Sequence, residues 1–395
     1  MNNYITKINE KGTVAVDDTI LVKGVQATAG SRILEGFKSL FSAEAVERLE
    51  KQGYTISGKT NVGEFGLDLV GEFSHYSSDD AQLKGAAASL VESGEVDYAL
   101  AVDMNGSARR AASLSGVSFL KPTYGTVSRY GVISCAASGE QVGVYSKNTD
   151  GIKEIMTVIA GHDDKDGTCL PAESYNYSNS DDVSKMKVCV VKELLEKADD
   201  TIKNKTNAYV QALSELGVSV ETVSCGDLFD VANTSWQILM SAETCNNVSR
   251  YDGVKFGYRS PEYKNIDELY VNTRTQGFNF LTKAVILYGS DVLSKNRYAD
   301  CYDKSLRIRR IVSEKIAELC EKYDAIITPV SSVSSYEKYD IKDAFGKVFE
   351  ESVFTCVANL IGVPALVTDG VQLIGKHFGE NAVLSLAHAV ERKGE

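Results

Sequence analysis

Ser107 stands in the stretch Asp-Met-Asn-Gly-Ser-Ala-Arg-Arg at residues 103–110, where several neighbours suit a nucleophilic serine. A serine hydroxyl reacts only when a neighbouring group accepts its proton, and the developing oxyanion needs backbone N–H groups directed at it. Asn105 and Gly106 are residue types that readily adopt the turn conformations that would present such groups. The positive charge of Arg109 would suit an anionic substrate group.

The same stretch also fits a purely structural role. Asn105 and Gly106 can form a tight turn, and Ser107 can cap the helix that follows it. The residues around Ser107 do not match the GxSxG elbow of the α/β-hydrolases, and the chain contains neither a GxGxxG dinucleotide-binding loop nor a phosphate-binding P-loop. By themselves, these residues favour the turn-and-cap interpretation over the catalytic one.

The elements that must position this stretch indicate an α/β fold. Strands are predicted at residues 14–16, 20–22, 98–102, 187–191, 218–223 and 325–330, and helices at 31–52, 86–92, 150–160, 201–216 and 305–323. The helix at 31–52 is predicted because apolar residues recur at spacings of three and four. Since helices and strands alternate with short links, we expect a mixed, largely parallel sheet. The strand at 98–102 leads into the Ser107 stretch.

The composition is that of a folded, acidic protein without a metal or redox motif. The 395 residues are 43% hydrophobic and 24% charged, and the net charge is −12. This charge argues against direct binding to nucleic acid, which needs clustered Lys and Arg side chains. The eight cysteines form no CxxC pair and the four histidines are scattered, so we expect a cytoplasmic protein with reduced thiols and no metal or cofactor. No apolar run is long enough for a membrane helix.

Longer stretches carry a family resemblance. The segment SGVSFLKPTYGTVSRYGVI, together with KGVQATAGSRILEGF, SRYDGVKFGYR, NTRTQGF and ANLIGVPALV, closely resembles the amidase signature family. Within that family it is most similar to the A subunits of tRNA-dependent amidotransferases. The matching stretches follow the family's order and span roughly residues 14–390, so the resemblance covers nearly the whole chain.

The resemblance implies a fold and an activity. It implies one domain over residues 1–395, built on a single mixed sheet that helices cover on both faces, with shortened N-terminal, 65–84 and 366–372 regions. The family's catalytic set is a nucleophilic serine, a second serine, and a lysine that acts as base through the second serine. In the amidotransferases, the A subunit hydrolyses glutamine, and the ammonia passes to the B subunit, which amidates Glu-tRNA(Gln) or Asp-tRNA(Asn).

Carried over residue by residue, the resemblance keeps the nucleophile and loses its two partners. Ser107 matches the nucleophilic serine. Leu83 stands at the position of the middle serine and Asp17 at the position of the lysine, so an alkyl group replaces a hydroxyl and an anion replaces a cation. Ala284 and Val285 stand where the family has a basic pair. The substrate-binding positions implied by the match are Asn105, Gly106, Arg109 and Ser352, the last of which replaces an acidic residue.

We therefore predict an A-like component of a tRNA-dependent amidotransferase, a pseudo-amidase without glutaminase activity of its own. Polar stretches such as SRYDGVKFGYR are not needed for folding alone, so we expect partners: B-like and C-like amidotransferase proteins or a second copy of this chain, tRNA only indirectly, and no membrane. Two alternatives stay open. One is a stand-alone amidase for another small amide that uses a Ser107–Lys84 dyad. The other is a non-catalytic ligand-binding or scaffold paralogue.

Overall fold

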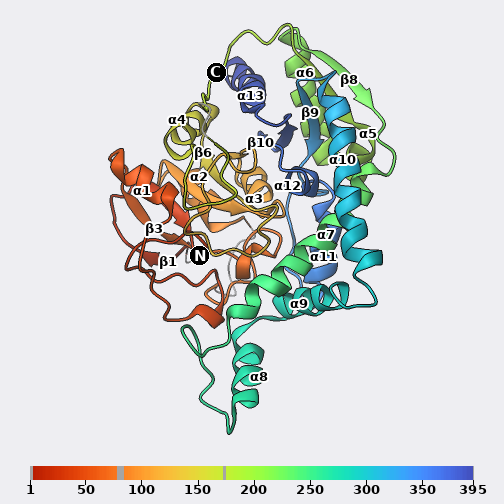
Figure 1. The fold of residues 1–395 in the computed structure, drawn as a ribbon. Helices are drawn as coiled ribbons and strands as arrows, with labels where there is room; N and C mark the ends of the chain where they lie inside the picture. The colour runs from red at the N-terminus through yellow and green to blue at the C-terminus, as the bar shows by residue number, and fades with distance from the viewer. Residues whose placement is uncertain (1–2, 78–83, 172–174, 395) are drawn as a thin grey trace.

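The computed structural model describes residues 3–77, 84–171 and 175–394 (Figure 1). Its strands are β1 (Tyr4–Lys7), β2 (Val14–Asp17), β3 (Ile56–Thr60), β4 (Tyr98–Asp103), β5 (Ser118–Lys121), β6 (Gln141–Ser146), β7 (Lys187–Val191), β8 (Ser219–Val223), β9 (Ala325–Pro329), β10 (Ala365–Thr368) and β11 (Val371–Ile374). Its α-helices are α1 (Glu44–Lys51), α2 (Ala86–Ser93), α3 (Ser107–Ser115), α4 (Thr149–Ile159), α5 (Lys192–Lys197), α6 (Asp200–Glu215), α7 (Leu228–Asn247), α8 (Ile266–Gly277), α9 (Phe280–Val292), α10 (Lys304–Cys320), α11 (Ala344–Ser352), α12 (Cys356–Leu360) and α13 (Glu380–Gly394).

The eleven strands of the described residues form one mixed sheet in the order β1-β3-β2-β4-β6-β5-β10-β11-β9-β7-β8. β3, β2 and β4 are parallel to one another, and so are β9, β7 and β8. The pairings that connect these two groups, from β4 to β9, are all antiparallel. The predicted mixed sheet is confirmed, but the expectation that it is largely parallel is wrong. One cause is the hairpin of β10 and β11, whose two-residue turn at Asp369 and Gly370 has positive φ angles and enforces antiparallel pairing.

Helices cover both faces of the sheet, which confirms the predicted α/β architecture (Figure 1). Side chains alternate along the strands, so Val14 and Val16 pack into one core and Ala15 packs into another. α1, α4, α6 and α13 cover the first face. On the second face, α2 and α3 lie against β4, and α7, α10 and α12 enclose a further core around Trp236. The strand that leads to Ser107 is therefore held from both sides.

The predicted helix at 31–52 is wrong over its middle part. The structure has a short 3-10 helix, η1 (Arg32–Leu34), and then α1, which begins only at Glu44. The residues between them pair with an earlier segment through a bridge between Gln26 and Lys38, and the rings of Phe37 and Phe256 lie 5.4 Å apart. Long-range contacts override the local apolar spacing here. The strand predicted at 20–22 is reduced to one bridge between Ile20 and Val132, whereas the other predicted elements are present with ends shifted by a few residues.

α8 lies at one end of the molecule, apart from the sheet, and packs mainly against η1 (Figure 1). Its buried residues are Leu269, Thr273 and Gly277, which form a single narrow stripe. Its exposed apolar residues do not form a membrane span, since no helix among the described residues combines the length and the apolar character that crossing a bilayer requires.

The packing of α9 on α7 gives a test of the fold. Gly289 of α9 lies so close to α7 that a Cβ atom there would overlap the backbone carbonyl of Ser241. We expect Gly289→Ala to lower the free energy of unfolding by about 1–3 kcal/mol, because the α7 backbone cannot move aside without disturbing the core. Gly346 in α11 is the matched control: the space around it is open, so Gly346→Ala should raise the free energy of unfolding by about 0.5–1 kcal/mol through helix propensity. Urea unfolding measures both effects, and equal effects would contradict the close contact of α7 and α9.

Candidate functional site

Ser107 is the first residue of α3 and follows β4 after a short turn, in the predicted strand–turn–helix setting. Gly106 precedes it with a φ of 87°, a conformation that favours glycine, and a Cβ atom at Gly106 would also overlap the side chain of Thr355. Gly106, not Ser107, is the N-cap residue of α3, so the capping role predicted for Ser107 is wrong. Ser107 is half-buried and lines a cavity that is described below.

A buried ion pair holds the turn before Ser107. Arg109 Nε and Nη2 each donate to one carboxylate oxygen of Asp103 at 3.0 Å, and both side chains are fully buried. Burial alone would raise the pKa of Asp103, but the Arg109 charge and hydrogen bonds hold it below its usual value. Arg109 also donates to the Thr355 carbonyl, to Gln372 Oε1 and to Asn359 Oδ1. All five of its N–H groups are thus used within the protein, which leaves none for the predicted substrate contact.

Asn105 and Ser352, two other residues that the sequence assigned to substrate binding, contact each other. Asn105 Nδ2 donates to Ser352 Oγ at 2.7 Å, and Ser352 Oγ donates to the Val348 carbonyl of α11 at 2.5 Å. Both side chains are buried, and neither lines the cavity beside Ser107. Ser352, predicted to stand in place of the family's acidic residue, therefore ties α11 to the Ser107 turn. A role of these two residues in substrate binding stays a prediction.

Three further residues, Arg110, Thr355 and Asn359, fix this turn, a role that the sequence did not predict for them. Arg110 Nη1 donates to the Asn105 carbonyl at 3.1 Å and to Thr355 Oγ1 at 3.0 Å, and Thr355 Oγ1 donates to the same carbonyl at 3.0 Å. Asn359 Nδ2 donates to Asp103 Oδ1 at 2.8 Å and to the Gly139 carbonyl at 3.1 Å. A signal was present, because Asn359 is the one polar side chain in the apolar stretch ANLIGVPALV.

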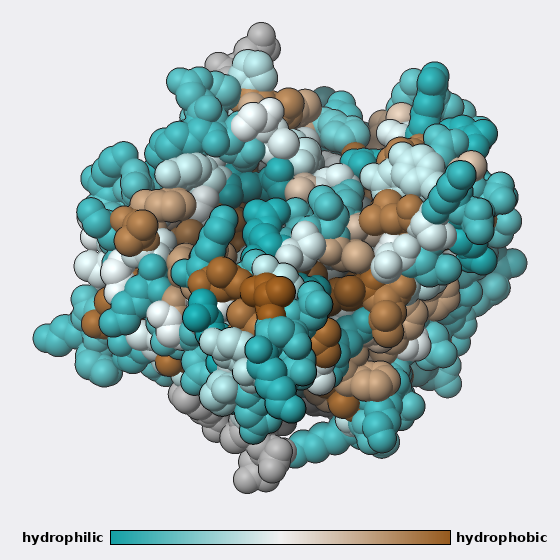
Figure 2. All heavy atoms as spheres, turned by 60° about the horizontal axis from the view of Figure 1, so that its bottom comes forward, coloured by the Kyte–Doolittle hydropathy of each residue, from teal (hydrophilic) through white to brown (hydrophobic). Residues whose placement is uncertain are grey.

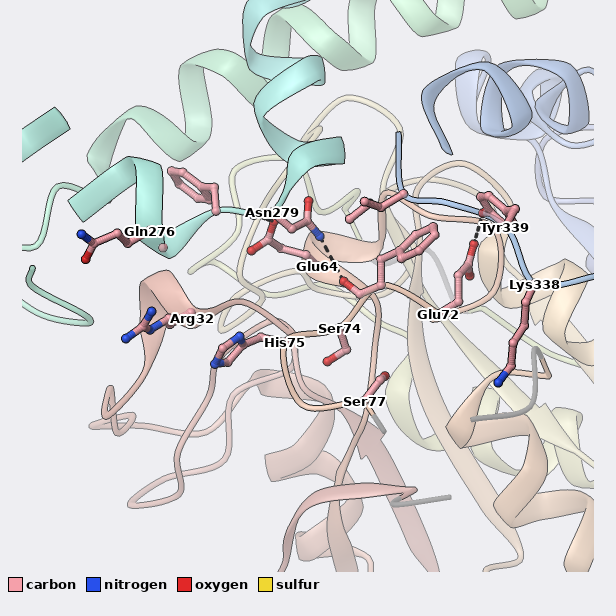
Figure 3. A pocket seen from close by; sticks show the side chains of 14 residues that line it. Arg32, Glu64, Glu72, Ser74, His75, Ser77, Gln276, Asn279, Lys338 and Tyr339 are labelled. Atoms are coloured by element: carbon pink, nitrogen blue, oxygen red, sulfur yellow. Dashed lines mark hydrogen bonds between the residues drawn. The ribbon is translucent and has the colours of Figure 1, made fainter. Parts of the chain in front are cut away.

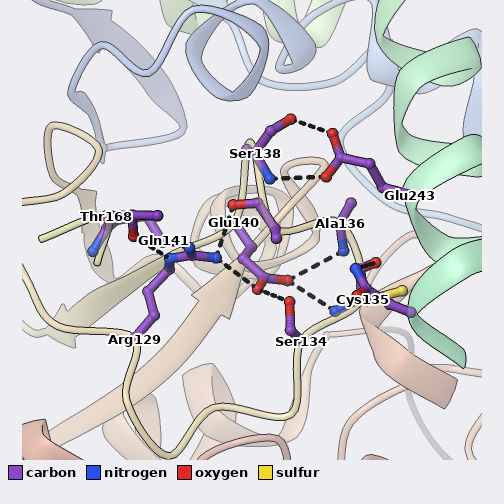
Figure 4. A network of polar contacts seen from close by, with 12 residues as sticks. Arg129, Ser134, Cys135, Ala136, Ser138, Glu140, Gln141, Thr168 and Glu243 are labelled. Carbon is purple, nitrogen blue, oxygen red and sulfur yellow. Dashed lines mark hydrogen bonds and ion pairs between the residues drawn. The ribbon is translucent and has the colours of Figure 1, made fainter. Parts of the chain in front are cut away.

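The segment that carries Gly139 is fixed by a second polar network (Figure 4). The Glu140 carboxylate accepts from the Ser134 hydroxyl, from the backbone N–H groups of Cys135 and Ala136 at 2.9 and 3.2 Å, and from Arg129 Nη1 at 3.0 Å. Glu243 of α7 accepts from the backbone N–H of Ser138 at 2.8 Å. Through these bonds, α7 and β6 hold the Gly139 carbonyl where Asn359 reaches it.

A small cavity of about 40 Å³ lies beside Ser107. Its polar lining consists of Asp17, Thr60, Asn61, Asp68, Ser107 and Tyr145. The structure thus brings Asp17, at the end of β2, to the same cavity as Ser107, although the two are far apart in the sequence. Leu83, the predicted substitute of the middle serine, lies outside the described residues.

Asp17 is a constrained carboxylate. Its Oδ1 accepts from the backbone N–H of Thr19 at 2.8 Å and from the Thr19 hydroxyl, and its Oδ2 accepts from the backbone N–H of Val102 at 2.7 Å. Burial raises the pKa of Asp17, against the opposing effect of these hydrogen bonds and of Lys59. When Asp17 is ionised, its charge opposes formation of an alkoxide at Ser107.

Two lysines of this part of the chain, Lys59 and Lys84, are engaged elsewhere. Lys59 Nζ donates to Asp18 Oδ1 at 3.0 Å and to the Asp18 carbonyl at 3.2 Å, and both side chains are fully buried. Lys84 Nζ pairs with Glu92 at 3.4 Å on the surface. Neither lysine lines the cavity beside Ser107, so the described residues provide no amine base there.

A larger cavity of about 420 Å³ lies between residues 72–77, 276–279 and 338–341 (Figure 3). Glu64, which sequence reasoning did not single out, is buried in its wall. It accepts from Ser31 Oγ at 2.5 Å, from the backbone N–H of Asn279 at 2.8 Å and from the Thr282 hydroxyl. Burial raises the pKa of Glu64 to about 7, although these hydrogen bonds oppose the shift. Glu64 therefore joins η1 to the start of α9.

The single mixed sheet and the Ser107 turn at the end of β4 define an amidase fold. The family model described as Amidase matches residues 13–384, so this chain belongs to the amidase family. The chain is similar to the A subunit of the Glutamyl-tRNA(Gln) amidotransferase of Fusobacterium nucleatum, with 34% identity over 96% of this chain and 82% of that protein. It is also similar to the crystal structure of the A subunit from Thermotoga maritima, with a TM-score of 0.82 and 29% identity over 99% of this chain and 87% of that chain. With 6-aminohexanoate cyclic dimer hydrolase it shares the fold alone, at a TM-score of 0.77 and 19% identity over 96% of this chain and 84% of that chain.

Glu64 should make stability depend on pH. The folded chain keeps the Glu64 proton up to about pH 7, whereas an unperturbed glutamate releases it near 4.5, so this group lowers the free energy of unfolding as the pH rises between those values. Glu64→Gln cannot titrate and should flatten this part of the profile by up to about 3 kcal/mol. The measurement is urea unfolding from pH 4.5 to 8, with Glu196→Gln, an exposed glutamate, as control. Parallel profiles for Glu64→Gln and the unaltered chain would contradict the prediction.

Proposed function

We propose that this chain is an A-like component of a tRNA-dependent amidotransferase that has no glutaminase activity of its own. One observation carries the proposal: the Asp17 carboxylate lies in the cavity beside Ser107, at the position where the family resemblance places a lysine. In an unrelated serine hydrolase, loss of one catalytic residue lowers kcat on the order of a million-fold. The resemblance also puts Leu83 in place of the relay serine, so that two catalytic groups are replaced.

The interactions that hold the turn support a protein that keeps the fold of the family after losing its catalytic activity. The Asp103–Arg109 pair, Asn359 and Thr355 fix the Ser107 turn through contacts that do not include Asp17. A change at Asp17 can therefore remove the base without removing the fold. A protein that contributes shape and contacts to a complex, and not catalysis, is the role that fits this separation.

An exposed apolar surface supports a role in a complex. α8 and α9 expose Ile266, Tyr270, Val271, Phe280 and Leu287, with Val271 62% and Leu287 71% exposed. Figure 2, which brings the α8 end of the molecule forward, shows hydrophobic side chains gathered across this face. Exposed apolar patches mark interaction sites. We expect a B-like or C-like amidotransferase protein to bind here, and the net charge of −12 favours tRNA contact through that partner.

Two alternatives stay predictions. A stand-alone amidase with a Ser107–Lys84 dyad would need Lys84 to leave its ion pair with Glu92 and to reach Ser107. A ligand-binding paralogue has one observation in its favour, the 420 Å³ cavity that Glu64 lines. A protein that recovers no partner would favour these alternatives over the role in a complex.

The purified chain, alone and with B-like and C-like amidotransferase proteins, should release no ammonia from glutamine, because no described amine base lines the cavity beside Ser107. The reconstituted complex should amidate Glu-tRNA(Gln) with ammonium chloride and not with glutamine. Mass spectrometry after treatment with a glutamine-analogue electrophile should find no more label on Ser107 than on Ser214, an exposed serine. Selective labelling of Ser107 would contradict the loss of activity.

Association should depend on the apolar face of α8 and α9. Val271→Asp and Leu287→Asp should each reduce co-purification with B-like and C-like amidotransferase proteins, because a charge would have to be buried in the contact. Phe378→Asp is the control: Phe378 is 56% exposed and lies two residues before the start of α13, which is at the opposite end of the molecule from α8 (Figure 1). The readout is pull-down from native extract followed by size-exclusion chromatography. Equal loss with all three variants, or a strictly monomeric protein, would contradict this interface.

A further inference from the structure

The cavity beside Ser107 is lined by two buried carboxylates that make no ion pair with any described residue. Asp17 and Asp68 are 3% and 1% exposed, and both line the cavity. Their hydrogen-bond donors are uncharged: Thr19 and Val102 for Asp17, and the backbone N–H groups of Gly71 and Phe73 for Asp68. Residues 78–83, which the structure does not describe, contain no Lys or Arg.

The nearby cations do not compensate this charge directly. Lys59, which interacts with Asp17, is paired with Asp18 at 3.0 Å. Arg110, which interacts with Asp68, donates to the carbonyls of Leu69 and Asn105 and to the Thr355 hydroxyl, and a further carboxylate, Glu72, lies beside Asp68. Buried carboxylates without a partner cation are costly. In line with this, burial raises the pKa of Asp17, and burial together with Glu72 raises the pKa of Asp68 well above its ordinary value.

The cavity also carries acceptors that are not used. Asp68 Oδ1 and Oδ2 each accept one hydrogen bond, at 2.9 and 2.7 Å, so each keeps a further lone pair. Thr60 is completely buried beside Asp17 in the β2–β3 register, and its Oγ1 has no hydrogen-bond partner among the described residues. Asn61 is half-buried and also lines the cavity, and its buried Oδ1 has no hydrogen-bond partner among the described residues. A buried hydroxyl and a buried amide oxygen without partners, next to two carboxylates, indicate that a hydrogen-bond donor with positive charge belongs here.

We propose that this cavity binds one ammonium ion, held by the Asp17 and Asp68 carboxylates and by the oxygens of Thr60 and Asn61. Its volume of about 40 Å³ has room for a particle of the size of one water molecule, which ammonium matches. The carboxylates exclude an anion, and a neutral water molecule would leave their charge unpaired. An alkali cation supplies the charge but no N–H groups, so the open hydroxyl and carboxylate lone pairs favour ammonium.

The residues that line the cavity are the basis for the proposed ammonium site. The role of the bound ion rests on the proposed function. An amidotransferase component without glutaminase activity must obtain ammonia from solution, where ammonium is the abundant form at neutral pH. Asp17 stands where the family carries a lysine, so a free cation would occupy the space of a side-chain amine. The cavity would then deliver to the complex the nitrogen that glutamine no longer supplies.

The test is isothermal titration of the full chain with ammonium chloride, potassium chloride, sodium chloride and tetramethylammonium chloride at constant ionic strength. We expect saturable binding of ammonium and weaker binding of the other three. Crystals soaked in a thallium(I) salt, whose cation replaces ammonium and gives an anomalous signal, should show a peak between Asp17 and Asp68. This experiment needs no partner, so its result is independent of whether the chain works in an amidotransferase.

Four variants make the test specific. Asp17→Asn should weaken ammonium binding about tenfold or more, because hydrogen bonds to charged groups are the strong ones. Thr60→Val keeps the shape of the side chain and should weaken binding several-fold. Asp17→Lys restores the family's residue and should abolish binding, because its own ammonium group would fill the cavity. Asp200→Asn changes a carboxylate that is 96% exposed and should have no effect.

Circular dichroism and thermal unfolding must show that each variant is folded. If Asp17→Asn fails to fold, the affinity of Thr60→Val for ammonium and the thallium peak still decide whether the cavity binds a cation. Absence of saturable ammonium binding to the unaltered chain would overturn the site. Equal affinity for potassium would overturn the assignment to ammonium. Ammonium binding by a chain that never joins a complex would overturn the proposed function and leave the site standing.

Discussion

The buried pair of Asp103 and Arg109 is the interaction on which the rest of this region depends. It joins the end of β4 to α3, and its other hydrogen bonds reach Thr355 and Asn359 at α12 and Gln372 in β11. Asn359 in turn donates to the Gly139 carbonyl, just before β6. Both charges are fully buried, so each depends on the other and on the surrounding hydrogen bonds for its stability. Because these partners come from distant parts of the chain, the position of Ser107 is set by the whole fold and not by its own turn.

This dependence shows how the site can keep its shape under the proposed loss of its catalytic base. Asp17 lies at the end of β2, and its carboxylate is stabilised by hydrogen bonds from Thr19 and Val102 and by the charge of Lys59. Other side chains make the contacts that fix the Ser107 turn, so the proposed exchange of lysine for aspartate leaves those contacts in place. In the proposed ammonium site, the carboxylate attracts a cation to the space that a lysine side chain would have occupied.

Particular residues show how far sequence reasoning reached. The strand at 98–102 and the helix that follows Ser107 were predicted because the apolar run, Asn105 and Gly106 are local signals, and the structure has them as β4 and α3. The helix predicted at 31–52 was wrong because Phe37 and Lys38 make contacts with residues 256 and 26, which no local period contains. Arg109 was predicted to face a substrate from its charge and from the family match. Its five bonds within the protein could not be foreseen without the positions of Gln372 and Asn359. The extent of the single domain over 1–395 stays a prediction.

The sequence by itself determined the amidase resemblance and the strand–turn–helix at Ser107, because these follow from residue types in order along the chain. Through that resemblance it also predicts that Asp17 stands in place of a lysine. The tertiary structure decided which polar residues face a cavity and which form buried hydrogen bonds within the protein around the Ser107 turn. It placed Asp17, Thr60 and Asp68 around one small space, and it turned Arg109, Asn105 and Ser352 inward. The physical reason is that hydrogen-bond satisfaction and burial depend on partners distant in sequence, which are brought together only when β2, β3 and β4 pair and α11 and α12 pack on α7.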